Sequence, residues 1–263
     1  MKRSSSKWRL HQFYYRDTYI RRFLPATALL SPRTLNGMLN RYRSVYIKPD
    51  RLHRGSGIMV AQKTPHGYGY AKMRGKTVVR QTRILTIQEL NRRIRRDAAP
   101  GTNLIQQAIP LAAIQGRPFD IRAMMMRKPH GKWGFFGFFV KVAGRVTFIT
   151  NLQRSGGSIM TLDEALRRSF RMNPVQIASK KRSLILLSHR ISERFQHYKA
   201  STNQIGIDFG LDRAGRIWVI EVNFDYPAHH PFAMLPDKSA YWRIKRMQRA
   251  IRAARRRTRS RVR

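Results

Sequence analysis

Residues 205–225 read Ile205-Gly-Ile-Asp208-Phe-Gly-Leu-Asp212-Arg-Ala-Gly215-Arg-Ile-Trp-Val-Ile-Glu221-Val-Asn223-Phe-Asp225 and contain four of the thirteen acidic residues of this 263-residue chain. Two runs rich in β-branched and aromatic residues flank a turn signal at Asp212–Gly215, so the stretch predicts a β-hairpin. If Leu211 pairs with Arg216, Asp208 faces Val219. Glu221 is then the diagonal neighbour of Asp208, with roughly 7–8 Å between their Cα atoms.

This hairpin gathers polar side chains on one face. Because side chains alternate along a strand, Asp208, Glu221 and Asn223 project from the same side, and glycines on either side of Asp208 leave room for a ligand. The opposite face is predicted to be buried and to carry Ile205, Ile207, Phe209, Trp218, Ile220 and Val222. Two carboxylates and an amide are costly to bury without a cation. The oxygen donors favour Mg²⁺ or Mn²⁺; the alternative is an internal salt bridge to one of the many arginines.

The composition restricts the class of protein. Lysine and arginine number 54, which gives a formal net charge of +41 and points to anionic partners such as nucleic acid, an acidic polymer or nucleotide phosphates. An apolar content of 42% excludes a wholly disordered chain. The absence of cysteine excludes disulfide scaffolds, zinc fingers and thiol catalysis. Neither a membrane-spanning run nor a signal peptide is evident, so we expect a cytoplasmic protein.

The C-terminal segment is the most basic part of the chain. Residues 243–263 contain eleven basic side chains and no acid. Ile244, Met247 and Ile251 recur at helical spacing, which is typical of a basic amphipathic helix that packs down and then frays. A solvated, partly disordered tail is the alternative that the charge density favours. Either form could bind nucleic acid or another polyanion without sequence specificity.

The order of the predicted elements indicates an α+β fold. Strands are expected at 45–47, 58–60, 77–79, 104–109, 119–126, 133–142, 146–151, 205–211 and 216–223, and helices near 86–97, after 161 and over 174–199. The irregular alternation suggests two α+β lobes. We expect an N-terminal segment with a small lobe over residues 1–103, a large lobe over 104–237 and a basic helix or tail over 238–263.

Several polar positions outside the hairpin could carry chemistry. Lys48 ends a strand and precedes a basic loop with Gly55, Ser56 and Gly57, which could cradle phosphates or form a plain turn. Asp120 and Arg122 share a strand face, as a mutual ion pair or as catalytic groups. Lys141 lies in an apolar strand and needs an anionic partner if it is buried. The loop from Asn151 through Arg154 to Gly157 could be an anion nest or only a turn.

Taken in order, these segments resemble the ATP-grasp superfamily, and within it the YheC/YheD-type endospore-associated family. The resemblance covers roughly residues 7–225. It rests on Lys7-Trp8, Leu24-Pro-Ala-Thr27, Tyr46-Ile-Lys-Pro49, Ile105-Gln-Gln107, Phe119-Asp-Ile-Arg122, Thr150-Asn-Leu152 with Gly156-Gly157, and Gly206-Ile-Asp208 through Trp218-Val-Ile-Glu-Val-Asn223.

The resemblance implies an ATP-grasp fold, in which two α+β lobes clasp a nucleotide. Lys48 would contact the ATP phosphates, the Gly55–Gly57 loop would close over them, and the strand with Gln106, Gln107 and Ile109 would flank adenine. Asp208, Glu221 and Asn223 would hold one or two Mg²⁺ ions, Arg122 and Lys141 would stabilise phosphoryl charge, and Asn151 with Arg154 would line the acceptor side. The implied activity is ligation of a carboxylate to an amine or thiol through an acylphosphate, with an acceptor that the sequence does not identify and that could be acidic.

Three features depart from the family pattern. A preceding substrate-binding domain is not evident, and the chain reads Asn223-Phe-Asp-Tyr-Pro227 where a Pro-Gly turn is common. An upstream second nucleotide lysine is not evident either, and Lys7 is a weak candidate for it. Two other functions therefore remain open. One is a protein that binds nucleic acid or another polyanion, and the other is a degenerate ATP-grasp protein that serves as a structural component of the spore.

Overall fold

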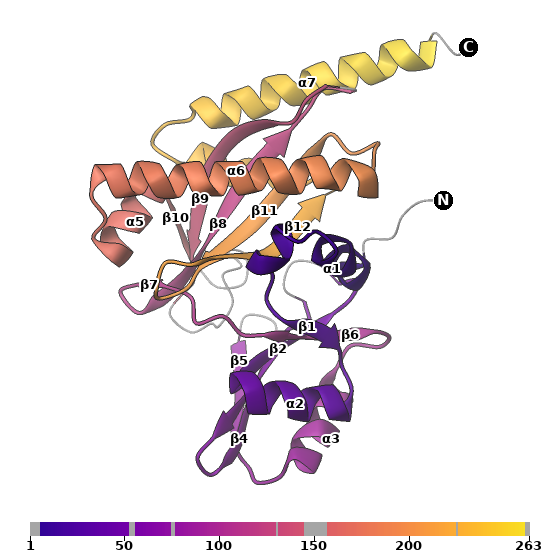
Figure 1. The fold of residues 1–263 in the computed structure, drawn as a ribbon, viewed down its shortest axis with the longest axis vertical. Helices are drawn as coiled ribbons and strands as arrows, with labels where there is room; N and C mark the ends of the chain where they lie inside the picture. The colour runs from indigo at the N-terminus through magenta and orange to yellow at the C-terminus, as the bar shows by residue number, and fades with distance from the viewer. Residues whose placement is uncertain are drawn as a thin grey trace.

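A computed structural model of the chain describes residues 6–52, 56–74, 77–129, 131–144, 157–224 and 226–260. It contains two antiparallel sheets, one above the other in Figure 1. The first sheet has the strand order β1-β6-β2-β3-β4-β5. Its strands are β1 (Thr27–Leu29), β2 (Ser44–Pro49), β3 (Met59–Thr64), β4 (Gly67–Arg74), β5 (Thr77–Ile84) and β6 (Asn103–Gln107). With helices α2 (Pro32–Tyr42) and α3 (Ile87–Asp97), it forms the small lobe.

Capping and apolar spacing explain the two helices of the small lobe. Ser31 and Thr34 form a reciprocal capping box at the start of α2, and Thr86 accepts a hydrogen bond from the backbone N–H of Glu89 at the start of α3. These caps satisfy backbone donors that would otherwise lack partners. Both helices bury apolar side chains at a spacing of four residues, and these pack on the sheet in a core made of Leu35, Leu39, Leu90, Ile94, Val45, Ile47 and Ile105.

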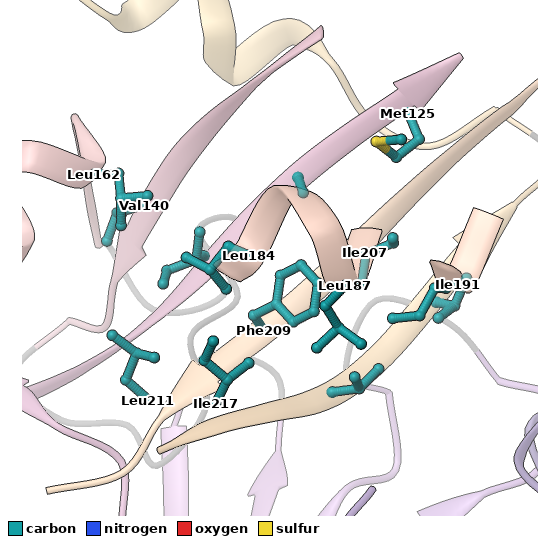
Figure 2. Close-up of a cluster of buried hydrophobic side chains, with 14 of the residues drawn as sticks. Met125, Val140, Leu162, Leu184, Leu187, Ile191, Ile207, Phe209, Leu211 and Ile217 are labelled. Atoms are coloured by element: carbon teal, nitrogen blue, oxygen red, sulfur yellow. The ribbon is translucent and has the colours of Figure 1, made fainter. Parts of the chain in front are cut away.

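The second sheet has the order β10-β9-β8-β11-β12, with β7 paired to β8. Its strands are β7 (Ala113–Ile114), β8 (Arg117–Met126), β9 (Gly134–Val142), β10 (Ser158–Met160), β11 (Gln204–Leu211) and β12 (Ile217–Phe224). Helices α1 (Lys7–Tyr15), α5 (Leu162–Phe170) and α6 (Pro174–Tyr198) pack on one face of it. Figure 2 shows Leu184, Leu187 and Ile191 of α6 beside Ile207 and Phe209 of β11. These elements form the large lobe.

The other face of the large sheet is covered over one end by the C-terminal segment. A 3₁₀ helix, η2 (His230–Met234), leads into α7 (Ser239–Ser260). Ile244 and Ile251 of α7 are buried with Met124, Met126 and Phe139 of the sheet. The apolar spacing thus does produce a packed helix, and the alternative of a partly disordered tail is wrong for these residues. No helix of the described residues is long and apolar enough to cross a membrane.

Most predicted strands and helices are present, with ends shifted by a few residues. The strand expected at 146–151 lies outside the described residues. The sequence pattern missed α2, the strand β4 and the short strands β1, β7 and β10. The expected boundary between the lobes lies between residues 103 and 104, at the start of β6. The whole of β6 belongs to the first sheet, so the small lobe continues to the end of this strand.

Candidate functional site

The β11–β12 hairpin forms with a register that differs from the predicted one. Leu211 pairs with Ile217 instead of Arg216, because the turn is longer: the backbone N–H of Asp212 donates to the carbonyl of Arg216 over 3.1 Å. A bulge between Asp208 and Phe209 then shifts the register by one more residue, and Asp208 lies directly opposite Glu221.

The two displacements cancel for the polar residues. A shift of one residue moves side chains to the other face, and the bulge moves them back. Asp208, Glu221 and Asn223 therefore share one face, as the alternation predicts. Between the turn and the bulge the prediction was wrong: Trp218 pairs with Gly210 on the face of Asp208, and Ile217 and Val219 take the buried positions in the core against α6.

The carboxylate of Asp208 is the centre of a buried network. Arg122 on the neighbouring strand β8 donates to both of its oxygens, from Nε over 2.6 Å and from Nη2 over 2.8 Å. The amide nitrogen of Asn223 donates to it over 2.9 Å, and Lys141 Nζ lies 3.3 Å away. Burial acts to raise the pKa of Asp208, but Arg122 and Lys141 outweigh that effect and hold the pKa well below its usual range. The salt-bridge alternative thus describes Asp208 in this structure.

Lys141 and Asp120 complete this network. Asp120 pairs with Lys141, with 2.9 Å between Nζ and Oδ1, so the expected mutual pair of Asp120 with Arg122 is replaced by two cross-strand pairs. Burial acts to lower the pKa of Lys141, but the carboxylates of Asp120 and Asp208 raise it above its usual value. The buried partner that Lys141 requires is therefore a carboxylate in this structure.

Glu221 is the more open of the paired carboxylates. Its side chain is 36% exposed, against 8% for Asp208, and Lys7 Nζ lies 4.0 Å from Oε1. Lys7 comes from the first turn of α1 and also donates to the carbonyl oxygens of Pro49, the last residue of β2, and of Leu52, three residues beyond it. Lys7, which the sequence offers only as a weak candidate for an upstream nucleotide lysine, therefore lies where the two lobes meet.

Lys48 approaches the same carboxylates from the small lobe. Its Nζ donates to Gln106 Oε1 over 2.6 Å, and Gln106 Nε2 donates in turn to Thr27 Oγ1 over 3.0 Å, which fixes the amide orientation on β6. Burial lowers the pKa of Lys48 to about 8, an effect that the charge of Glu221 opposes and that of Lys7 reinforces. Lys48 on the small lobe and Glu221 on the large lobe are thus close enough for their charges to interact.

The structure describes four of the remaining predicted site residues. Gln107 accepts a hydrogen bond from the backbone N–H of Ala26 over 3.3 Å, and Ile109 is buried just beyond the end of β6. Gly57 has φ of +69°, and a Cβ there would lie 2.9 Å from the Pro49 ring, so the loop needs glycine at this point. Ser56 precedes it in the same turn. Gly55, Asn151 and Arg154 lie outside the described residues.

The donor set is compatible with a hard divalent cation. Glu221 offers an open carboxylate, and Asn223 uses its amide nitrogen on Asp208, which leaves its carbonyl oxygen available. These are oxygen donors of the kind that Mg²⁺ takes together with substrate phosphates. The described residues hold no group of three or more His, Cys, Asp or Glu side chains arranged for a metal ion. Any metal here would therefore depend on Asn223 and on ligands outside the protein.

Asp50 is a site neighbour that the sequence pattern did not reveal. Its buried carboxylate accepts hydrogen bonds from Ser6 Oγ over 3.0 Å and from the backbone N–H of Trp8 over 2.8 Å. It thereby holds the first turn of α1, and with it Lys7, against the strand end that carries Lys48. The local signal was Ser6 at a helix N-cap; its partner 44 residues away could be seen only in the fold.

Comparisons with known proteins place the chain in a family. The chain is 26% identical over 244 residues to the endospore coat-associated protein YheD of Bacillus subtilis (strain 168), a match that covers 90% of this chain and 53% of YheD. The chain thus spans about half the length of this curated relative. The family described as YheC/D like ATP-grasp matches residues 2–250. Both findings bear out the resemblance read from the sequence, and the chain belongs to the YheC/D-like ATP-grasp family.

Proposed function

We propose that the chain binds ATP together with Mg²⁺ where the two lobes meet, and uses it to activate a carboxylate for ligation. Membership of the ATP-grasp family implies ATP binding, and ATP-grasp proteins are typically ATP-dependent ligases. The observation that carries the proposal is the convergence of Lys7 and Lys48 on Glu221, since these three charges come from three separate segments of the chain.

The charges suit a bound polyphosphate. Lys7 and Lys48 are lysines whose pKa is lowered first of all by burial, so a phosphate would supply the negative charge that favours their protonated forms. Arg122 and Lys141 form ion pairs with Asp208 and add two further positive charges near the site. Glu221 and Asn223 would hold Mg²⁺, which would neutralise phosphate charge. Catalysis would then rest on positioning and charge stabilisation.

The proposed reaction has two steps. A carboxylate oxygen of the acceptor attacks the γ-phosphorus, the bond from that phosphorus to the bridging oxygen breaks, and ADP leaves with the bond electrons. An amine or thiol then attacks the acyl carbon of the acylphosphate, inorganic phosphate leaves, and the attacking atom loses its proton. The first step would be assisted by Lys48 and Arg122, because each can donate hydrogen bonds to oxygens that gain negative charge.

The biological setting belongs to the proposal as well. YheD is described as associated with the endospore coat, and we place this chain in the same setting.

The test is calorimetric titration of ATP with and without Mg²⁺ on the wild type and on Glu221→Gln. We expect binding that Mg²⁺ strengthens in the wild type, and a loss of that Mg²⁺ effect in the variant with no loss of folding. The fold should persist because Glu221 is half-buried and its nearest cation is 4.0 Å away.

Glu193→Gln is the matched control. Glu193 is an exposed residue of α6 with the same charge, and its substitution should leave ATP binding unchanged. Binding of ATP that ignores both Mg²⁺ and Glu221 would overturn the proposal, because the basic surface alone would then account for the attraction.

A further inference from the structure

Helix α7 has one apolar face, and that face packs against the large sheet. Ile244 and Ile251 are buried against the large sheet, and Ala240 and Met247 pack against the same cluster. Two of its arginines are bound to the body of the protein: Arg243 donates to the carbonyl of Phe136 over 2.9 Å, and Arg255 to Asn203 Oδ1 over 2.6 Å. The helix is therefore fixed on the large lobe along most of its length.

The opposite face of α7 presents cations to solvent. The helix Ser239–Ser260 contains eight arginines, one lysine and no acid. Arg246, Arg249, Arg252 and Arg256 are exposed and recur every three or four residues, and Trp242 is exposed on the same side. Within the described part of the chain, no acidic side chain forms an ion pair with these four arginines.

This charge pattern costs stability in the free protein. Like charges at three- and four-residue spacing repel one another and destabilise a helix. The protein keeps this row although glutamate or glutamine at these exposed positions would form the helix equally well. A polyanion bound along the row would remove the repulsion, because each phosphate or carboxylate offsets one guanidinium.

The buried position of the apolar face of α7 decides which kind of partner this helix can bind. Such helices often insert an apolar face into a membrane surface or into the groove of a partner protein. In α7 that face lies in the core of the large lobe. The side left for recognition is a straight array of guanidinium groups, whose planar forks match phosphate oxygens.

We propose that the exposed face of α7 binds the phosphate backbone of double-stranded nucleic acid. The four arginines lie between residues 246 and 256 of α7, a row about 15 Å long at 1.5 Å per residue. Each strand of a duplex carries one phosphate per about 3.4 Å of its axis, so the row can meet about four successive phosphates of one strand. Binding of this kind is independent of base sequence and strongly dependent on salt.

The surface is separate from the proposed ATP site. Arg122, Lys141, Lys48 and Lys7 all face Asp208 or Glu221 near the small lobe. Figure 1 shows α7 at the end of the large lobe that lies away from the small lobe. Loss of the α7 charges should therefore leave ATP binding intact, and failure of one proposal does not decide the other.

The experiment measures binding of a fluorescent 20-base-pair DNA duplex of arbitrary sequence over a range of salt concentrations. The test variant replaces Arg246, Arg249, Arg252 and Arg256 by Gln, which keeps the helix propensity. The control variant replaces Arg33, Arg41, Arg92 and Arg95 by Gln, which are exposed arginines on α2 and α3 of the small lobe. Both variants remove four positive charges, so they separate the α7 surface from the overall charge of the chain.

We expect the α7 variant to bind the duplex about tenfold more weakly or worse, with a salt dependence shallower by about 3 to 4 in the slope of log affinity against log salt. The control variant should change far less, and circular dichroism should report folded protein in both cases. Equal losses in the two variants would overturn the proposal in favour of diffuse charge. Tighter binding of poly-glutamate than of the duplex at equal salt would overturn it in favour of an acidic polypeptide partner.

Discussion

The protonation state of Lys48 should change when a phosphate binds at the proposed ATP site. Burial lowers its pKa to about 8, so the free protein loses this positive charge as the pH rises through 8, and a bound phosphate would raise the pKa again. We therefore predict that ATP affinity falls above pH 8 and that binding near pH 8 takes up a proton. Loss of one charged hydrogen bond is worth roughly 1.5–3 kcal/mol, or about a tenfold to hundredfold loss of affinity at the alkaline limit.

Calorimetry in buffers of different ionisation enthalpy measures that proton uptake. Lys48→Arg is the control, because a guanidinium stays charged throughout this pH range. Its ATP affinity, whatever its absolute value, should not decline between pH 7.5 and about 9.5. A parallel decline in both proteins would assign the titration to another group.

At the residue scale, the sequence could predict which side chains share a face but not which ones pair. Period-two alternation placed Asp208, Glu221 and Asn223 together, and it did so correctly because a turn shift and a bulge compensate each other. The two cationic partners of Asp208, Arg122 on β8 and Lys141 on β9, lie 86 and 67 residues earlier in the chain. Strand order across a sheet decides such contacts, and no local pattern in one sequence encodes it.

At the scale of elements, α7 is held by a few buried side chains. Ile244 is fully buried and Trp242 is 60% exposed two residues earlier. Ile244→Ala should therefore lower the free energy of unfolding by about 2–4 kcal/mol, through lost burial and a residual cavity, and Trp242→Ala by no more than about 0.5 kcal/mol. Denaturant unfolding of the two variants measures the difference. Equal effects would show that α7 does not pack as the structure has it.

The spacing of Ile244, Met247 and Ile251 predicted the buried face of α7, whereas its docking place could not be predicted. The receiving surface consists of Met124, Met126 and Phe139, which are side chains of two strands. Charge density argued for a disordered tail, but burial of this apolar stripe against a ready apolar sheet face outweighs the repulsion among arginines. In the small lobe, α3 was predicted from Thr86 and Glu89, which match the usual capping-box pattern, whereas α2 was missed because its capping box has Thr34 in place of Glu or Gln.

At the scale of the whole molecule, α1 connects the lobes. Its Leu10 and Tyr14 lie in the large-lobe core, and the Tyr14 hydroxyl donates to the carbonyl of Ile191 over 3.4 Å. Its first turn is held by Asp50, next to β2 of the small lobe. The sequence order grouped an N-terminal segment with the small lobe over residues 1–103, and nothing local shows that a helix preceding one sheet packs on the other.

Asp50 therefore determines how firmly Lys7 is held at the proposed ATP site. Asp50→Ala removes the acceptor for Ser6 Oγ and for the Trp8 backbone N–H, a loss comparable to that of a helix cap at about 0.5–2 kcal/mol. Because this bond joins the lobes rather than building either core, most of the loss should appear as weaker ATP binding, by about fivefold to tenfold, with little change in the unfolding midpoint. Asp50→Asn retains an acceptor oxygen and should recover much of the affinity. Hydrogen exchange at residues 7–15 provides the second readout: faster exchange in Asp50→Ala with unchanged ATP affinity would mean that α1 is loosened but Lys7 takes no part in binding.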